Sequence, residues 1–154
     1  MHRIFREHLP RAQGDSRFVV ACFVDVRDFS SFFAESVEGA YFLRQLYRRL
    51  LDDFFPDASY FKPTGDGLMI ISDIDDANIA ETTRGTLTTS LRLVQEFPRL
   101  FERDPMINFP TPERLGIGIA RGAASRLFVE GQTLDYSGRT LNLAARLMDL
   151  ARPE

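Results

Sequence analysis

The hydrophobic pattern of the chain alternates between short apolar runs and longer stretches with helical spacing. Residues 18–26 (FVVACFVDV) form a nearly continuous apolar run, rich in β-branched and aromatic side chains. A run of this kind predicts a central strand that is covered on both faces. Only Asp25, near its end, interrupts the run, and a carboxylate buried there without a cation would be costly.

Two long segments have the three- and four-residue spacing of amphipathic helices. They predict helices over residues 30–55 and from residue 75 to about 103. We expect the second helix to bury the following side chains: Leu87, Leu91, Val94, Leu100 and Phe101. A third helix is predicted over residues 140–151, after Gly138 and before Pro153.

The segment between the first two predicted helices reads as a β-hairpin. Its turn, residues 63–67 (PTGDG), places Asp66 between two glycines at the tip. Residues 115–124 (LGIGIARGAA) predict a strand in which glycine allows close backbone approach. One more short strand is expected over residues 127–130, before a turn at Gly131.

The order of these elements predicts an α+β fold. It is that of a ferredoxin-like βαββαβ sandwich with additional elements. Residues 1–16 are polar and interrupted by Pro10 and Gly14, so we expect a tail or short helix before a domain over residues 17–154.

Composition narrows the possible partners. The chain has 154 residues, enough for one domain with a real core, and a net charge of −3 with acids and bases mixed along it. A basic groove for nucleic acid is therefore not indicated. Cys22 is the one cysteine, so no internal disulfide can form. No signal peptide and no run of about 20 apolar residues is present, so we expect a cytoplasmic protein without a membrane span.

Two isolated acids, Asp25 and Asp66, lie where predicted strands end. If the first strand lies beside the hairpin in an antiparallel sheet, the two carboxylates can converge. Converging carboxylates suit Mg²⁺, which takes oxygen ligands together with the phosphates of its substrate. The alternative is that each acid is an ordinary turn residue, and spacing alone does not decide between them.

The last predicted helix carries a second group of candidate residues. Asn142 and Arg146 are four residues apart, so they share one helix face, and Asp135 precedes them. An amide and a guanidinium on one face can orient a sugar and a phosphate. The alternative is a solvated face on which Arg146 pairs with Asp149 or Glu130.

Four ordered segments resemble the motifs of class III adenylate/guanylate cyclase catalytic domains. These are FVDVRDFSSFF, FKPTGDGLMII, LGIGIARG and DYSGRTLNLAARLMDLA. The match runs in order from about Phe18 to Ala151 and so covers most of the chain. The sequence departs from the family in three ways: Asp28 stands where the family has glycine, a Gly-Asn-x-Gly loop is absent from residues 123–134, and the chain is expected to lack the family's last strands.

The resemblance implies roles for four of these residues. Asp25 and Asp66 match the acids that bind two Mg²⁺ (or Mn²⁺), and Lys62 and Asp135 match the pair that reads the base. Lys62 is only a donor and ionised Asp135 only an acceptor, which fits the adenine edge and rejects guanine. Cytosine presents the same pattern, so ATP is preferred because the pair resembles that of adenylate cyclases, with CTP or another pyrimidine nucleotide as the alternative.

The resemblance also implies a dimer. Asn142 matches the asparagine that orients the ribose, and Arg146 the arginine that stabilises the transition state. In this family the metal acids come from one protomer and the other contacts from its partner, which implies a homodimer with two composite sites and an inactive monomer.

The expected function is metal-dependent cyclisation of a nucleoside triphosphate, giving the 3′,5′-cyclic monophosphate and pyrophosphate. One alternative is a cyclase-homology domain without turnover that binds nucleotide or mediates dimerisation. Another is a different phosphoryl-transfer enzyme, such as a diguanylate cyclase, but the Gly-Gly-acid-acid-Phe signature of that class is missing.

Overall fold

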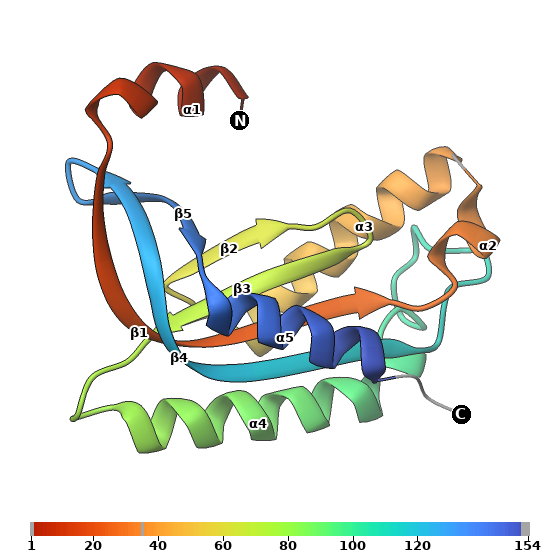
Figure 1. Ribbon diagram of the computed structural model, residues 1–154. Coiled ribbons are helices and arrows are strands. Elements are labelled where there is room, and N and C mark those ends of the chain that lie inside the picture. The colour runs from red at the N-terminus through yellow and green to blue at the C-terminus, as the bar shows by residue number, and fades with distance from the viewer. Residues whose placement is uncertain (1, 35, 152–154) are drawn as a thin grey trace.

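The structure, a computed structural model, describes residues 2–34 and 36–151. Glu35, inside the first expected helix, and Pro153, expected to end the last one, lie outside these residues. The described chain forms a five-stranded antiparallel sheet with helices packed on both faces (Figure 1). No helix within the described ranges is both long enough and apolar enough to cross a membrane.

The order of strands across the sheet is β2-β3-β1-β4-β5. The strands are β1 (Gln13–Val26), β2 (Tyr60–Pro63), β3 (Gly67–Asp73), β4 (Leu115–Val129) and β5 (Gln132–Ser137). The helices are α1 (His2–His8), α2 (Phe29–Phe33), α3 (Val37–Arg49), α4 (Ile79–Glu96) and α5 (Arg139–Leu150). The first four strands, with helices after β1 and β3, have the expected βαββαβ order, so the ferredoxin-like prediction is confirmed. β5 and α5 are the additional elements.

Alternate residues of β1 pack against opposite layers, as expected for a central strand. On one face the core contains Cys22, Val24 and Val26 of β1, Phe42 and Leu46 of α3, and Leu93 of α4. On the other face it contains Val19 and Ala21 of β1 together with Leu141 and Ala144 of α5. α5 lies so close to β4 that a Cβ on Gly118 would come within 2.0 Å of the Ala144 carbonyl oxygen, which confirms the close approach predicted from the glycines.

β1 and β4 are both longer than the pattern predicts. β1 begins at Gln13, inside the segment expected to be a tail, and β4 continues unbroken to Val129. The register pairs Gln13 with Phe128, so each extension supplies the backbone hydrogen-bond partners of the other. The separate strand expected at residues 127–130 is therefore wrong, because residues 127–129 end β4. The expected turn at Gly131 (φ 83°) leads into β5, which was not predicted.

The single helix expected over residues 30–55 is divided into α2 and α3. Ala34 has left-handed backbone angles (φ 32°, ψ 56°), which end α2. Ser36 begins α3 as its N-cap, and its hydroxyl accepts a hydrogen bond from the Gly39 amide at 3.2 Å. A Cβ on Gly39 would lie 2.8 Å from the Phe33 Cβ, so the two short helices pack tightly at the break.

The buried face of α4 is not the one that the leucines predict. Three of the expected core side chains are 48%, 67% and 47% exposed: Leu87, Leu91 and Val94. The buried residues of α4 are Thr86, Ser90 and Leu93. The polar members can be buried because the Thr86 hydroxyl donates to the Thr82 carbonyl at 2.9 Å and the Ser90 hydroxyl lies 3.8 Å from the Cys22 sulfur. The expectation for Phe101 is confirmed, since it is 4% exposed.

Candidate active site

The two acids singled out from the sequence lie side by side in the sheet. β1 and β3 are antiparallel neighbours, and Asp25 pairs with Gly67, the residue after Asp66. The Val26 amide donates to the Asp66 carbonyl at 3.2 Å. Burial raises the pKa of the Asp25 carboxyl to about 6, and the charge of Asp66 and a hydrogen bond with it act in the same direction. The predicted convergence therefore occurs, and it concentrates negative charge that a cation would relieve.

The hairpin tip that carries Asp66 is held from two sides. A Cβ on Gly67 would lie 2.2 Å from the Val24 carbonyl oxygen, so only glycine permits this approach of the hairpin to β1. On the other side, the Tyr47 hydroxyl of α3 donates to the Gly65 carbonyl at 2.5 Å. Burial raises the pKa of the Tyr47 hydroxyl, as does the nearby charge of Asp66. Asp66 thus lies on a fixed turn.

Arg27 connects Asp25 to the end of α5. Its guanidinium donates to the Asp25 carboxylate at 3.0 Å, to the Ala151 carbonyl at 3.1 Å and to the Met148 carbonyl. Gly116 on β4 provides the space, because a Cβ there would lie 1.9 Å from the guanidinium. Sequence reasoning did not select Arg27. The sequence did contain a signal for it, because Arg27 is a positively charged residue only two positions after the partly buried Asp25.

Asp28 adopts the backbone conformation for which a glycine is suited. Its φ of 61° and ψ of 18° lie in the left-handed region, which aspartate tolerates better than most residues. Arg114 donates to its carboxylate at 2.5 Å. The replacement of glycine therefore leaves the turn in place, and the added charge is paired with a cation.

The predicted base-reading pair is formed across the sheet. Lys62 lies on edge strand β2 and Asp135 on the opposite edge strand β5, yet their charged groups are 2.8 Å apart. The sheet is therefore so strongly curved that its two edges meet above one face. The Tyr60 hydroxyl supports the contact, since it donates to the Leu134 carbonyl at 3.0 Å and lies 3.5 Å from Asp135. The side chains are 43% and 29% exposed for Lys62 and Asp135, which leaves the pair accessible to a ligand.

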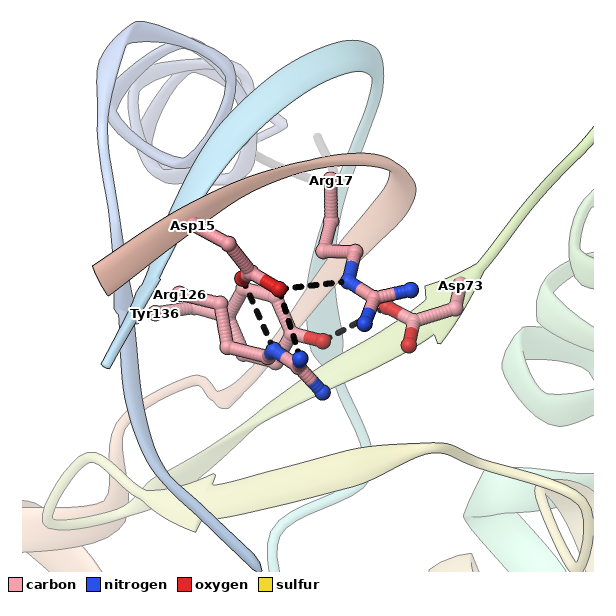
Figure 2. Close-up of polar contacts among 5 residues, drawn as sticks. All are labelled: Asp15, Arg17, Asp73, Arg126 and Tyr136. Atoms are coloured by element: carbon pink, nitrogen blue, oxygen red, sulfur yellow. Dashed lines mark hydrogen bonds and ion pairs between the residues drawn. The ribbon is translucent and has the colours of Figure 1, made fainter. Parts of the chain in front are cut away.

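A polar cluster beside this pair holds β5 in position (Figure 2). Arg126 donates two hydrogen bonds to Asp15, at 2.9 and 2.6 Å, and Arg17 donates a third at 3.1 Å. The hydrogen bonds from Arg126 hold the pKa of the Asp15 carboxyl below its usual range. The Tyr136 hydroxyl donates to Asp73 at 2.6 Å, and burial raises its pKa. Because Tyr136 follows Asp135 directly, the cluster also fixes the carboxylate that contacts Lys62.

Asn142 and Arg146 lie on the exposed side of α5, one helical turn apart. Among the described residues, neither side chain makes a hydrogen bond or an ion pair. Arg146 therefore pairs with neither Asp149 nor Glu130, and Glu130 instead forms an ion pair with Arg11 at 3.2 Å. The two side chains are available to a ligand or to a second chain.

The donor set at Asp25 and Asp66 fits a divalent cation that also binds phosphate. Among the residues that the structure describes, no cluster of three or more metal-ligating side chains forms. Mg²⁺ is commonly held by only one or two carboxylates, with substrate phosphates and water completing its coordination. The paired acids therefore suit a metal that arrives with a nucleotide better than a permanent structural metal.

No protein-family model and no curated protein matches the sequence. Solved structures do match. The adenylyl cyclase CyaB from P. aeruginosa is 18% identical with a TM-score of 0.70, over 91% of this chain and 75% of that chain. The guanylyl cyclase Cya2 is 19% identical with a TM-score of 0.65, over 90% and 73% of the two chains. An adenylate/guanylate cyclase/hydrolase from Silicibacter pomeroyi is 22% identical with a TM-score of 0.54, over 90% and 73%. The chain therefore has the fold of nucleotide cyclase catalytic domains, as the motif resemblance implied.

Proposed function

We propose that this chain is a metal-dependent nucleotide cyclase that converts ATP to the 3′,5′-cyclic monophosphate and pyrophosphate. The observation that carries the proposal is the convergence of Asp25 and Asp66 at neighbouring strand ends, on a fold shared with nucleotide cyclases. Two Mg²⁺ or Mn²⁺ ions bound there would lower the pKa of the ribose hydroxyl and neutralise the phosphates.

In the proposed reaction the ribose 3′ hydroxyl gives its proton to water as its oxygen attacks the α-phosphorus. The bond from phosphorus to the bridging oxygen breaks, and pyrophosphate leaves. Charge develops on the bridging oxygen and on the α-phosphate. The Arg146 guanidinium, which is exposed and without an ion pair in the described chain, can stabilise that charge. Asn142, one turn earlier, can hold the ribose by hydrogen bonds.

Lys62 and Asp135 select the base. The ammonium donates to a ring nitrogen, and the carboxylate accepts from the neighbouring exocyclic amine, which matches adenine. Guanine presents the reverse arrangement, so the ammonium would face a ring N–H and the carboxylate a carbonyl oxygen, which is strongly discriminating. A pyrimidine with the same edge, such as cytosine, satisfies both groups and is the second substrate to test.

We place each active site at the interface of a homodimer. Asp25 and Asp66 come from one protomer, and Lys62, Asp135, Asn142 and Arg146 come from its partner. Two features support this arrangement. First, within the described chain no hydrogen bond or ion pair joins Asn142 or Arg146 to Asp25 or Asp66. Second, Leu143, which follows Asn142 on α5, is 50% exposed and so available to a partner.

The test is incubation of the purified protein with each of the four ribonucleoside triphosphates plus Mg²⁺ or Mn²⁺, with chromatographic detection of cyclic products. We expect cyclic AMP from ATP, and we expect Asp25→Ala and Asp66→Ala to abolish it. Asp76→Ala, at an exposed acid in the loop before α4, is the matched control and should retain full activity. Wild-type turnover in Asp25→Ala or Asp66→Ala would refute the metal assignment.

Asp28 favours one second candidate function, nucleotide binding without turnover. Its carboxylate lies three residues after Asp25, where it adds negative charge near the expected triphosphate. The Arg114 ion pair offsets that charge, and for this reason we prefer the active enzyme. Metal-dependent binding of ATP with no product from any nucleotide would instead support the second candidate.

A further inference from the structure

A basic cavity lies on the side of α3, apart from the residues of the proposed active site. Its volume is about 270 Å³, and it is lined by five residues of α3, between Tyr41 and Arg49, and by residues 103–106. None of the proposed metal, base or ribose residues lines it. The cavity therefore needs an explanation that the proposed cyclase reaction does not supply.

The charge of this cavity is opposite to that of the whole chain. Arg44, Arg48 and Arg49 of α3 and Arg103 line it, against the single acid Asp104, in a protein with a net charge of −3. Arg49 forms an ion pair with Asp53 at 2.9 Å, but the other three arginines have no ion-pair partner among the described residues. Like charges four residues apart destabilise a helix, so Arg44 and Arg48 carry a cost that an anion would remove.

One residue that lines the same cavity, Gln45, has a buried oxygen without a hydrogen-bond partner. Gln45 is 9% exposed; its Nε2 donates to the Tyr41 hydroxyl at 2.7 Å, and its Oε1 has no hydrogen-bond partner. If the amide is turned over, the Tyr41 hydroxyl donates to the oxygen and the NH₂ group is the one left without a partner. Buried polar groups are normally satisfied, so the wall of this cavity is left with one unmet hydrogen bond beside the arginines.

We propose that this cavity binds a small anion with two or three phosphate groups. Guanidinium groups match phosphate oxygens with two parallel hydrogen bonds, which gives arginine clusters their preference for phosphate over simple anions. The volume admits a molecule of the size of pyrophosphate but not a folded partner. The site stands independently of the cyclase reaction, because none of the proposed catalytic residues contributes to it.

The test is calorimetric titration of the full chain with inorganic pyrophosphate in EDTA, so that no metal recruits the anion to Asp25 and Asp66. We expect one pyrophosphate per chain and affinity at least about tenfold lower in the double variant Arg44→Gln/Arg48→Gln. Both arginines are exposed, so this variant should fold, and circular dichroism will verify that it does. Arg84→Gln, at an exposed arginine on α4, is the control for general loss of charge and should bind as wild type does.

Three outcomes would overturn the proposal. Loss of binding in Arg146→Ala with full binding in the double variant would place pyrophosphate in the active site. Equal weakening by Arg84→Gln and by the double variant would show only non-specific attraction. Binding to phosphatidic acid vesicles without binding of soluble pyrophosphate would assign the arginines to a lipid surface instead.

Discussion

At the scale of single residues, the proposed metal site contains a carboxylate whose charge is destabilised by burial and by a neighbouring acid, together with an arginine that forms an ion pair with it. Asp25 is held next to Asp66, and Arg27 donates to it from the same strand end. The acids were predictable because Asp25 interrupts an apolar run and Asp66 lies between two glycines at a hairpin tip. Arg27 was not predictable, because its structural role depends on hydrogen bonds to two carbonyls more than 120 residues away in the chain.

Asp25→Asn should stabilise the metal-free protein at pH 8. A carboxyl pKa of about 6 exceeds the usual 3.8, so the folded state binds the proton more tightly than the unfolded state. Stability therefore falls as the pH rises from about 4 to 6 and stays lower above that range. We expect the variant to gain about 1–3 kcal/mol at pH 8 and little at pH 4.

Urea denaturation in EDTA at both pH values measures this difference. Adding Mg²⁺ at pH 8 should stabilise the wild type and leave the variant unchanged. If the variant were less stable than wild type at pH 8, the ionised Asp25 carboxylate would not destabilise the folded state.

Arg27→Leu should destabilise the protein by about 2–4 kcal/mol, because it leaves a partly buried carboxylate and two carbonyls without their shared donor. Arg114→Leu is the control, since it removes an exposed ion pair and should cost less than about 1 kcal/mol. Thermal unfolding of both variants gives the comparison. Equal losses would mean that Arg27 is an ordinary surface arginine.

At the scale of elements, the sequence predicted which main elements exist better than where they end or which face they bury. The hairpin, α5 and the central strand were predicted because turn residues and period are local signals. The face of α4 was predicted incorrectly: the expected core residues Leu87, Leu91 and Val94 are exposed. The buried residues of this helix are Thr86, Ser90 and Leu93. Hydrogen bonds from these hydroxyls make polar burial possible, and no hydrophobic pattern contains that information.

Two neighbouring leucine positions on α4 test this reversed face. Leu93→Ala should cost about 2–4 kcal/mol because the side chain is fully buried between α4 and the sheet. Leu91→Ala, at a side chain that is 67% exposed, should change stability by less than about 0.5 kcal/mol. Chemical denaturation of the two variants decides between the faces. A larger loss of stability for Leu91→Ala would mean that α4 packs against the sheet through the side that carries Leu87 and Leu91.

At the scale of the whole molecule, the curvature of the sheet produces the ion pair that we propose selects the base. Lys62 and Asp135 come from opposite edges and meet only because the five strands curl. Family resemblance indicated both residues, but spacing in the sequence does not predict the contact. The basic cavity of α3 is equally non-local, because Arg103 reaches it from a loop after α4.

The proposed dimer predicts complementation between inactive variants. Asp66→Ala removes one half of each composite site and Arg146→Ala the other, so each variant alone should be inactive. Random pairing of the two gives mixed dimers with one intact site, and the mixture should recover about one quarter of wild-type activity. Co-expression followed by a cyclic AMP assay measures the recovery. No recovery, with mixed dimers present, would place all catalytic residues within one chain.

The Arg27 contact gives this dimer a further property. Asp25 would serve one site, whereas α5, whose end Arg27 holds, would serve the other. If nucleotide binding at the second site shifts α5, Arg27 would transmit the shift to Asp25 in the first site. Occupancy of the two sites would then be thermodynamically coupled, and nucleotide binding curves would depart from those of independent sites.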